Sequence, residues 1–166
     1  VLVFLLITAT GAWVIQRAWA QLDRDIGVHR RLHRELARSE GRLRQLIDES
    51  PLAIQVVTAQ GVVVSVNRAW ERLWGVPLQA LASYNMLDDP QLAEAGVLPM
   101  IRQVLAGGEP SAVVTRYDRS ATPAVHAPSG QVVVKTRIYG NRDEQGAVHE
   151  FVLIQEDVSK LQDAED

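Results

Sequence analysis

The stretch Ala53–Pro77, "AIQVVTAQGVVVSVNRAWERLWGVP", carries the strongest fold signal in the chain. Two β-rich runs flank "AQG", where Gly61 can adopt the positive φ of a tight turn, so the first half predicts a β-hairpin. Asn67 stands where a helix N-cap belongs. A short helix, "RAWERLW", should follow and should end at Gly75 and Pro77.

Trp70 and Trp74 lie one helical turn apart on this helix, in a chain with four tryptophans in all. Large neighbouring rings on a short helix over a sheet favour core packing. Trp74 is the better candidate of the two for a pocket wall, because an indole N–H usually seeks a hydrogen-bond partner.

The residues after Pro77 predict short helices and then three strands. The helical segments are "LQALAS", then "DPQLAEAG" with Asp89 as cap and Pro90 at the first helical position, and "PMIRQVLAGG". The strand segments are "SAVVTRYD", "GQVVVKTRIYG" and "AVHEFVLIQEDV", the last two separated by the polar turn "NRDEQG". This order predicts an α+β fold, in which a five-stranded antiparallel sheet carries short helices on one face.

The sequence resembles a PAS sensor domain from about Leu43 to Leu161. "LIDESPLAIQVVTAQGVVVSVNRAWERLWGV" is similar to the family's opening, and "RDEQGAVHEFVLIQEDVSKLQ" to its last strand and Asp-Val-Ser ending. "YNMLDDPQLAEAGVLPMIRQVLAGG" is similar to the middle of a subgroup from bacterial membrane-bound signalling proteins. The resemblance implies a PAS domain at 49–159 and, at 160–166, the start of an exit helix to an output domain. That output is usually a histidine kinase and less often a diguanylate cyclase.

Residues 1–16, "VLVFLLITATGAWVIQ", carry no charge. A spanning helix needs about 20 apolar residues, so we expect this run to be the end of a transmembrane helix. Trp13 and Trp19 bracket its exit like an interfacial aromatic belt, and Arg17 and Arg24 follow. The positive-inside rule then predicts that the globular part lies in the bacterial cytoplasm, beside the inner membrane. A buried helix of a soluble protein is the alternative.

Residues 17–48 favour a long juxtamembrane helix that forms a coiled coil, because good helix formers dominate and proline is absent. A seam with alternating steps of four and three predicts a parallel homodimer. It runs through Ile15, Trp19, Leu22, Ile26, His29, His33, Leu36, Glu40, Leu43 and Ile47. His29 and His33 are polar seam positions that set register or weaken the coil. A metal site there is disfavoured because no carboxylate or thiolate accompanies the pair.

Composition argues against several functions. The chain has no cysteine, which excludes cysteine-dependent flavin photochemistry, and its net charge of −3 gives no sign of nucleic-acid binding. PAS haem sensors generally use a histidine on the long helix, which is "PMIRQVLAGG" in this chain and has none. The globular part has His126, in a loop, and His149, near the start of the last predicted strand. We therefore expect no haem. We find no nucleophile–base pair, metal cluster or phosphate loop, and therefore expect neither a metal nor enzymatic activity in this chain.

Two possibilities remain for the interior of the domain: it binds a small ligand, or it is a packed core without a ligand. The candidate ligand-binding residues are Trp74, Tyr84, Asn85, Arg116, Tyr117, Arg137 and Tyr139. Arg116 and Arg137 lie on neighbouring predicted strands, where they could bind a carboxylate or be surface residues with acidic partners. The resemblance places Asp157 and Ser159 at the start of the exit helix, where Asp157 would cap the helix and relay movement of the sheet. The predicted function is a sensory module, with a ligand-free scaffold for dimerisation as the alternative.

Overall fold

The protein is described here by a computed structural model that covers residues 29–123 and 125–162. Residues from Leu46 onward belong to one compact unit, and the helical residues before it belong to a second unit. The compact unit contains every strand in the described part of the chain.

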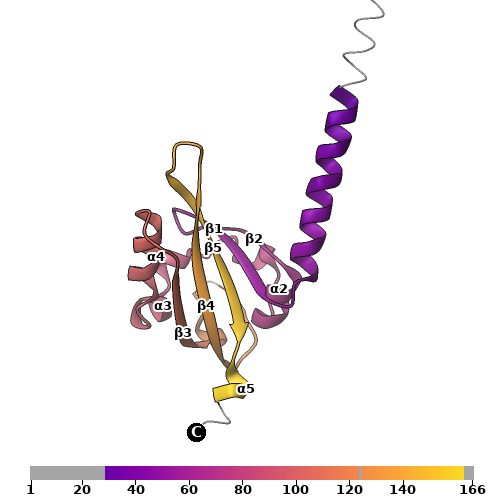
Figure 1. Cartoon of the computed structure of the whole chain (residues 1–166). Helices are drawn as coiled ribbons and strands as arrows, with labels where there is room; N and C mark the ends of the chain where they lie inside the picture. Colours follow the sequence, from indigo (N-terminus) through magenta and orange to yellow (C-terminus); the bar gives the residue numbers. More distant parts are fainter. Residues whose placement is uncertain (1–28, 124, 163–166) are drawn as a thin grey trace, which may run out of the picture. The chain divides into compact units, whose positions relative to one another are not determined.

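Five antiparallel strands form one sheet in the order β2-β1-β5-β4-β3 (Figure 1). The first and last strands are neighbours, with Ala53 opposite Gln155. The predicted α+β fold with a five-stranded antiparallel sheet is therefore confirmed. The strands are β1 (Ala53–Thr58), β2 (Val63–Val66), β3 (Ser111–Asp118), β4 (Gln131–Arg142) and β5 (Val148–Asp157).

Short helices connect β2 to β3. In chain order they are α2 (Arg68–Trp74), the 3-10 helices η1 (Leu78–Leu81) and η2 (Met86–Asp88), α3 (Pro90–Glu94) and α4 (Val97–Leu105). A further 3-10 turn, η3 (Arg119–Ala121), follows β3, and α5 (Ser159–Gln162) follows β5.

The helix ends follow from local capping chemistry. The Asn67 side chain accepts a hydrogen bond from the Trp70 N–H, and Gly75 ends α2 at a φ of 73°. Asp89 caps α3 with Pro90 in the first turn, as the sequence predicts. The helix α4 begins at Val97, two residues before the expected start, because proline is tolerated in a first turn whose N–H groups have no helical partner.

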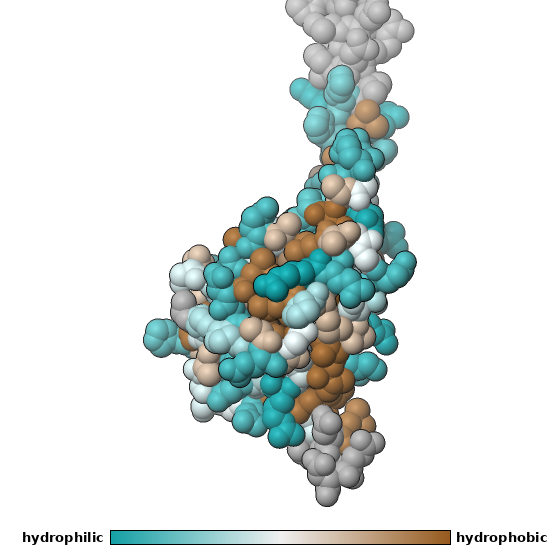
Figure 2. Space-filling view, turned by 90° about the vertical axis from the view of Figure 1, so that its left-hand side faces the viewer, coloured by the Kyte–Doolittle hydropathy of each residue, from teal (hydrophilic) through white to brown (hydrophobic). Residues whose placement is uncertain are grey.

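The helices between β2 and β3 cover one face of the sheet and form the core with it. Along β1, buried positions alternate with half-buried ones, and α4 packs its buried residues against β4 and β5. Phe151, Ile138, Ile101 and Val57 have no exposed surface. The opposite face of the sheet is more exposed and carries apolar and charged side chains together. Figure 2 shows one side of the molecule, where apolar surface lies between hydrophilic side chains.

The N-terminal helix spans residues 29–49, and the side chains from 29 to 47 are exposed in the single chain. Its leucines are each more than half exposed: Leu32, Leu36, Leu43 and Leu46. The predicted seam residues Leu36, Leu43 and Ile47 are all exposed apolar side chains. His29, His33 and Glu40 are exposed as well. The coiled coil itself stays a prediction.

The predicted membrane run at 1–16 lies outside the described residues, as do Trp13, Trp19, Arg17 and Arg24. Within residues 29–123 and 125–162, no helix has the length and hydrophobicity needed to span a membrane.

Candidate ligand site

A pocket lies between the inner face of the sheet and the segments that cover it. The unfilled space measures about 630 Å³ when the open solvent at the mouth of the pocket is counted. The strands β1, β5, β4 and β3 form its floor, and α2, the segment from Val76 to Val97 and the loop after η3 form its walls. Apolar side chains make up much of the wall, namely Val76, Leu81, Met86, Leu92, Val97 and Val125.

Aromatic side chains form one wall of the pocket. The centroids of Trp70 and Trp74 are 6.1 Å apart, with their planes tilted by 37°. Trp74 meets Tyr117 edge to face, with centroids 5.1 Å apart. Such edge contacts stabilise aromatic clusters by about 1 kcal/mol beyond the burial of their surface. The two tryptophans therefore belong to the core and the pocket wall at once.

Four polar side chains cross the floor on consecutive strands, and we call them the polar row: Gln55, Gln155, Thr136 and Thr115. They are buried, with exposed fractions of 2%, 7%, 4% and 7%. Gln155 lies directly opposite Thr136. Gln55 is the diagonal neighbour of Gln155 at one end of the row, and Thr115 is the diagonal neighbour of Thr136 at the other end.

The glutamines of the polar row hold the two indoles. The Trp70 Nε1–H donates to Gln55 Oε1 at 3.2 Å, and the Trp74 Nε1–H donates to Gln155 Oε1 at 3.0 Å. Because an indole N–H can only donate, each glutamine must turn its oxygen to the ring and its amide nitrogen away from it. Trp74 thus has the N–H partner that the sequence led us to expect.

A buried carboxylate lies behind the aromatic wall. Asp89 is 1% exposed, and its Oδ2 accepts hydrogen bonds from the hydroxyls of Tyr84, at 2.8 Å, and Tyr117. Its Oδ1 accepts the Gln91 N–H that caps α3. Burial is the main cause that raises the pKa of both tyrosines above the ordinary value, and the neighbouring Asp89 raises it further. Both phenols are therefore neutral hydrogen-bond donors at physiological pH.

Three of the predicted ligand residues line the pocket: Trp74, Tyr84 and Tyr117. The other four lie elsewhere. Asn85 caps η2 and donates its amide to the Gln60 carbonyl at 2.9 Å, so it fastens the β1–β2 turn. Arg116, Arg137 and Tyr139 are exposed, on strand positions that alternate with the buried, pocket-facing ones. Arg137 pairs with Ala112 and Arg116 with Val133, so the two arginines do not face each other.

Local sequence patterns did not predict that the polar row and Asp89 belong to the site. A signal for the row exists, because Gln55 alternates with Ala53 and Val57, and Thr136 alternates with Val134 and Ile138, on the inward side of their strands. The sequence predicts Asp89 as a helix cap, but its partner Tyr117 lies 28 residues further along the chain. Local sequence patterns do not reveal such contacts.

Two junctions connect the globular unit to its flanking helices. Asp157 Oδ1 accepts hydrogen bonds from the Ser159 N–H and, at 2.6 Å, from the Ser159 hydroxyl, and so caps α5. The same hydroxyl oxygen accepts the Val133 N–H of β4 at 2.9 Å. At the other end, the Asn67 amide donates to the carbonyls of Ile47 and Leu52. These bonds tie the end of the N-terminal helix to the sheet.

No group of three or more His, Cys, Asp or Glu side chains in the described part of the chain is placed to hold a metal ion. His126 and His149 are exposed and do not line the pocket.

The strand order, with the helices inserted between β2 and β3, defines a sensory-domain fold. The family model described as the PAS fold matches residues 47–163. The chain therefore belongs to the PAS family, as its sequence patterns suggest.

Solved structures of low sequence identity share this fold. The PAS domain of an HTR-like protein from Haloarcula marismortui is 19% identical, with a TM-score of 0.59, over 77% of this chain and 98% of that one. A domain of a sensory box sensor histidine kinase/response regulator from Geobacter sulfurreducens is 17% identical, with a TM-score of 0.55, over 74% and 96%. An RNA-binding light-oxygen-voltage receptor is 21% identical, with a TM-score of 0.61, over 78% and 36%. A search of curated proteins found no match.

Proposed function

We propose that the chain is a sensory and signal-relay module that binds a small ligand in the pocket between the sheet and the helices. The polar row carries the proposal, because four buried side chains with unused hydrogen-bonding groups face this space. A tightly packed core would pair such groups or replace them with apolar side chains. Largely apolar pockets with a few convergent polar groups are typical small-molecule sites.

The relay would run through the two junctions. A ligand on Gln155 acts on β5, and two residues later Asp157 and Ser159 begin α5. The Ser159 hydroxyl also accepts the Val133 N–H of β4. A shift of β5 against β4 would therefore change this hydrogen bond and move the first turn of α5. A ligand that favours one arrangement of these strands biases the exit helix accordingly. Asp157 and Ser159 are the relay residues in this scheme.

The wider assignment is to the cytoplasmic part of a membrane-anchored signalling protein of the sensor histidine kinase type. The uncharged run at 1–16 and the arginines after it support the anchor and its orientation. A similar structure from a sensor histidine kinase supports the output. A diguanylate cyclase output is the alternative.

A ligand-free scaffold for dimerisation is the second candidate, and the exposed leucines of the N-terminal helix favour it. Leu36 and Leu43 are seven residues apart and each 57% exposed, as expected for seam positions that a second copy would cover. Both candidate functions involve a dimer, but only the first requires a ligand in the pocket.

Thermal denaturation of the full chain with a panel of small acids, flavins and haem distinguishes the ligand-binding function from the ligand-free scaffold. Thr136→Met fills the pocket from its floor, and Lys135→Met adds the same side chain at the neighbouring exposed position. We expect at least one compound to raise the melting temperature of the wild type and Lys135→Met but not of Thr136→Met. If no compound does so, or if Thr136→Met responds like the wild type, the scaffold function stands.

A further inference from the structure

We infer that two copies of this chain pair along the free edge of β3, antiparallel and with a two-fold axis at Val114, so that their five-stranded sheets become one continuous sheet. This interaction surface lies outside the pocket and does not depend on whether a ligand is bound. Three properties of the described residues support it: unpaired backbone groups along the edge, an edge that is limited at both ends, and outer side chains that fit a second copy.

Three residues of β3 direct their backbone N–H and C=O groups away from the sheet: Ala112, Val114 and Arg116. β3 is the last strand in the sheet order, and alternate residues of an antiparallel strand point these groups to opposite sides. Asp118 points both groups outward, because its N–H donates to the Gln91 side chain at 2.8 Å and its C=O accepts from it at 3.0 Å. Alternation gives the three residues before it the same direction. Within the described residues, no hydrogen bond of their outward groups occurs.

The neighbouring strand β4 agrees with this direction. Val133 lies opposite Arg116, and it directs its own backbone groups to the other side of β4. Its N–H donates to the Ser159 hydroxyl, and its C=O accepts the Val158 N–H. The register of β3 with β4 runs without a bulge, and a regular edge with unpaired groups is a template for a further strand.

The free edge is limited at both ends, and its centre is Val114. At one end, the Gln91 amide already occupies both outward groups of Asp118, like a short piece of neighbouring strand. At the other end, Pro110 precedes the strand and has no N–H to donate to a neighbour. Residues 112–116 remain free. Two copies that meet antiparallel around Val114 therefore give every outward N–H and C=O in this range a partner.

The outer side chains fit this register. Val114 is 52% exposed and would pack against Val114 of the second copy, as cross-strand β-branched pairs do. Ala112 would lie opposite Arg116 of the second copy, so a small side chain accommodates a long one. A two-fold axis at Arg116 would instead place two like charges directly opposite each other, which is unfavourable.

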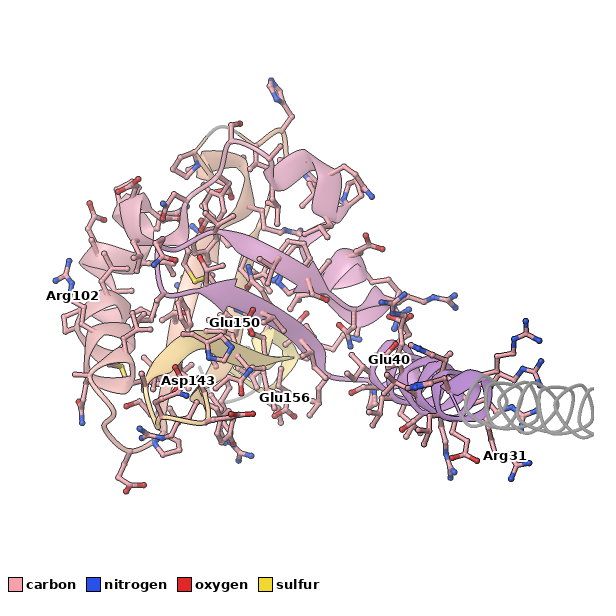
Figure 3. The ribbon with its side chains drawn as sticks, turned by 90° about the horizontal axis from the view of Figure 1, so that it is seen from above. Arg31, Glu40, Arg102, Asp143, Glu150 and Glu156 are labelled. Carbon is pink, nitrogen blue, oxygen red and sulfur yellow. The ribbon has the colours of Figure 1, made fainter. Side chains whose placement is uncertain are left out.

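Charges on the inner strands are compatible with the pairing. Lys135 of β4 lies opposite the two-fold position, and Glu156 of β5 lies opposite Lys135. Figure 3 shows Glu156 pointing away from the space between the sheet and the helices, so this opposite-charge pair lies on the outer face. Arg137 and Arg116 of the second copy would be separated by the strand that carries Ala112. Two strand spacings are about 10 Å, which is roughly the Debye length at 0.1 M salt.

Cysteine trapping in the full chain tests the inference, because the chain has no cysteine and each introduced thiol is therefore single. In the inferred register, the Cα atoms of the two Val114 positions lie about 5.5 Å apart, which a disulfide can span. We expect Val114→Cys to form a covalent dimer after oxidation with diamide, seen on a non-reducing gel. Lys135→Cys is the matched control on the exposed side of β4. Its two copies would be three strand spacings apart, about 14 Å, and should not cross-link.

A mixture of two further variants tests the register. Ala112→Cys and Arg116→Cys should each stay uncross-linked alone, since equivalent positions would lie about 13 Å apart along the strands. After the two variants are mixed and left to exchange subunits, they should form a covalent dimer. The inference is overturned if Val114→Cys gives no more covalent dimer than Lys135→Cys. It is equally overturned if Ala112→Cys alone cross-links as fully as the mixture.

Amide hydrogen exchange of the wild type adds a measurement that needs no substitution. Exchange of the outward amides at Ala112, Val114 and Arg116 should slow as the protein concentration rises. Exchange along the other edge strand, β2 (Val63–Val66), should not depend on concentration. In Val114→Lys, two like charges would meet at the two-fold axis, so the concentration dependence on β3 should disappear. An edge of β3 that exchanges at one rate at all concentrations would overturn the inference.

Discussion

Asn67 shows how one side chain can join several parts of this domain. It is 1% exposed and uses both ends of its amide. Its Oδ1 accepts the N–H groups of Ile54 and Trp70, and its Nδ2 donates to the carbonyls of Ile47 and Leu52. The residue therefore holds β1, α2 and the end of the N-terminal helix together.

Asn67→Ala should destabilise the protein by about 3 kcal/mol, because it removes a helix cap, leaves the Ile54 N–H without its acceptor and takes one of two donors from each of the Ile47 and Leu52 carbonyls. Urea unfolding of the full chain measures the change. Asn141→Ala removes an exposed amide that donates to Glu150, and should cost less than about 0.5 kcal/mol. A similar small loss for both variants would contradict the role assigned to Asn67.

The tyrosines around Asp89 give the stability of the domain a pH dependence in the alkaline range. Their pKa values are raised in the folded state, mainly by burial, so the folded protein holds these protons after the unfolded chain has released them. The stability from this effect is fully present below about pH 10, the ordinary tyrosine pKa, and is lost as pH rises beyond it.

Tyr84→Phe should therefore lose less stability between about pH 9 and pH 11 than the wild type does. Urea midpoints at several pH values measure the slope. Tyr139→Phe, on the exposed side of β4, is the control and should keep the slope of the wild type. An unchanged slope in Tyr84→Phe would show that the buried phenol does not contribute.

At the scale of elements, the β1–β2 turn fits against η2. The Gly61 carbonyl accepts the Met86 N–H at 2.9 Å, and the Asn85 amide donates to the Gln60 carbonyl. Gly61 has a φ of 89°, and a Cβ there would meet Asn85 Oδ1 and, at 2.8 Å, Leu87 Cγ. The turn needs glycine for both its backbone conformation and its close contact.

Gly61→Ala should cost about 2 kcal/mol more than Gly96→Ala. Both positions have a positive φ, but a Cβ at Gly96 meets no atom within 4 Å, so the difference isolates the contact with η2. Thermal denaturation of the two variants is the measurement. Equal losses would mean that the turn can move away from η2 at little cost.

The same elements explain what could be predicted from the sequence. The hairpin, the Asn67 and Asp89 caps and the strands depend on local chemistry, which the sequence displays directly. The pocket floor depends on strand order, since Gln55 and Gln155 are a hundred residues apart and meet only because β1 and β5 pair. Arg116 and Arg137 drew attention as charged residues, but alternation along β3 and β4 places them opposite the pocket-facing side chains.

At the scale of the whole molecule, one sheet joins a pocket to two helical connections. The inner face of the sheet carries the polar row, the strand β5 leads from Gln155 to α5, and Asn67 fixes the end of the N-terminal helix. A sensory module needs these three parts to share one sheet, because a ligand can shift the flanking helices only through contacts that differ between two arrangements.

Native mass spectrometry of the full chain, purified under non-denaturing conditions, shows whether the pocket holds a small molecule. We expect a non-covalently bound small molecule on the wild type and on Lys135→Met, which is lost on denaturation and absent from Thr136→Met. The same bare mass for all three proteins, together with no stabilisation by any compound of the panel, would contradict it.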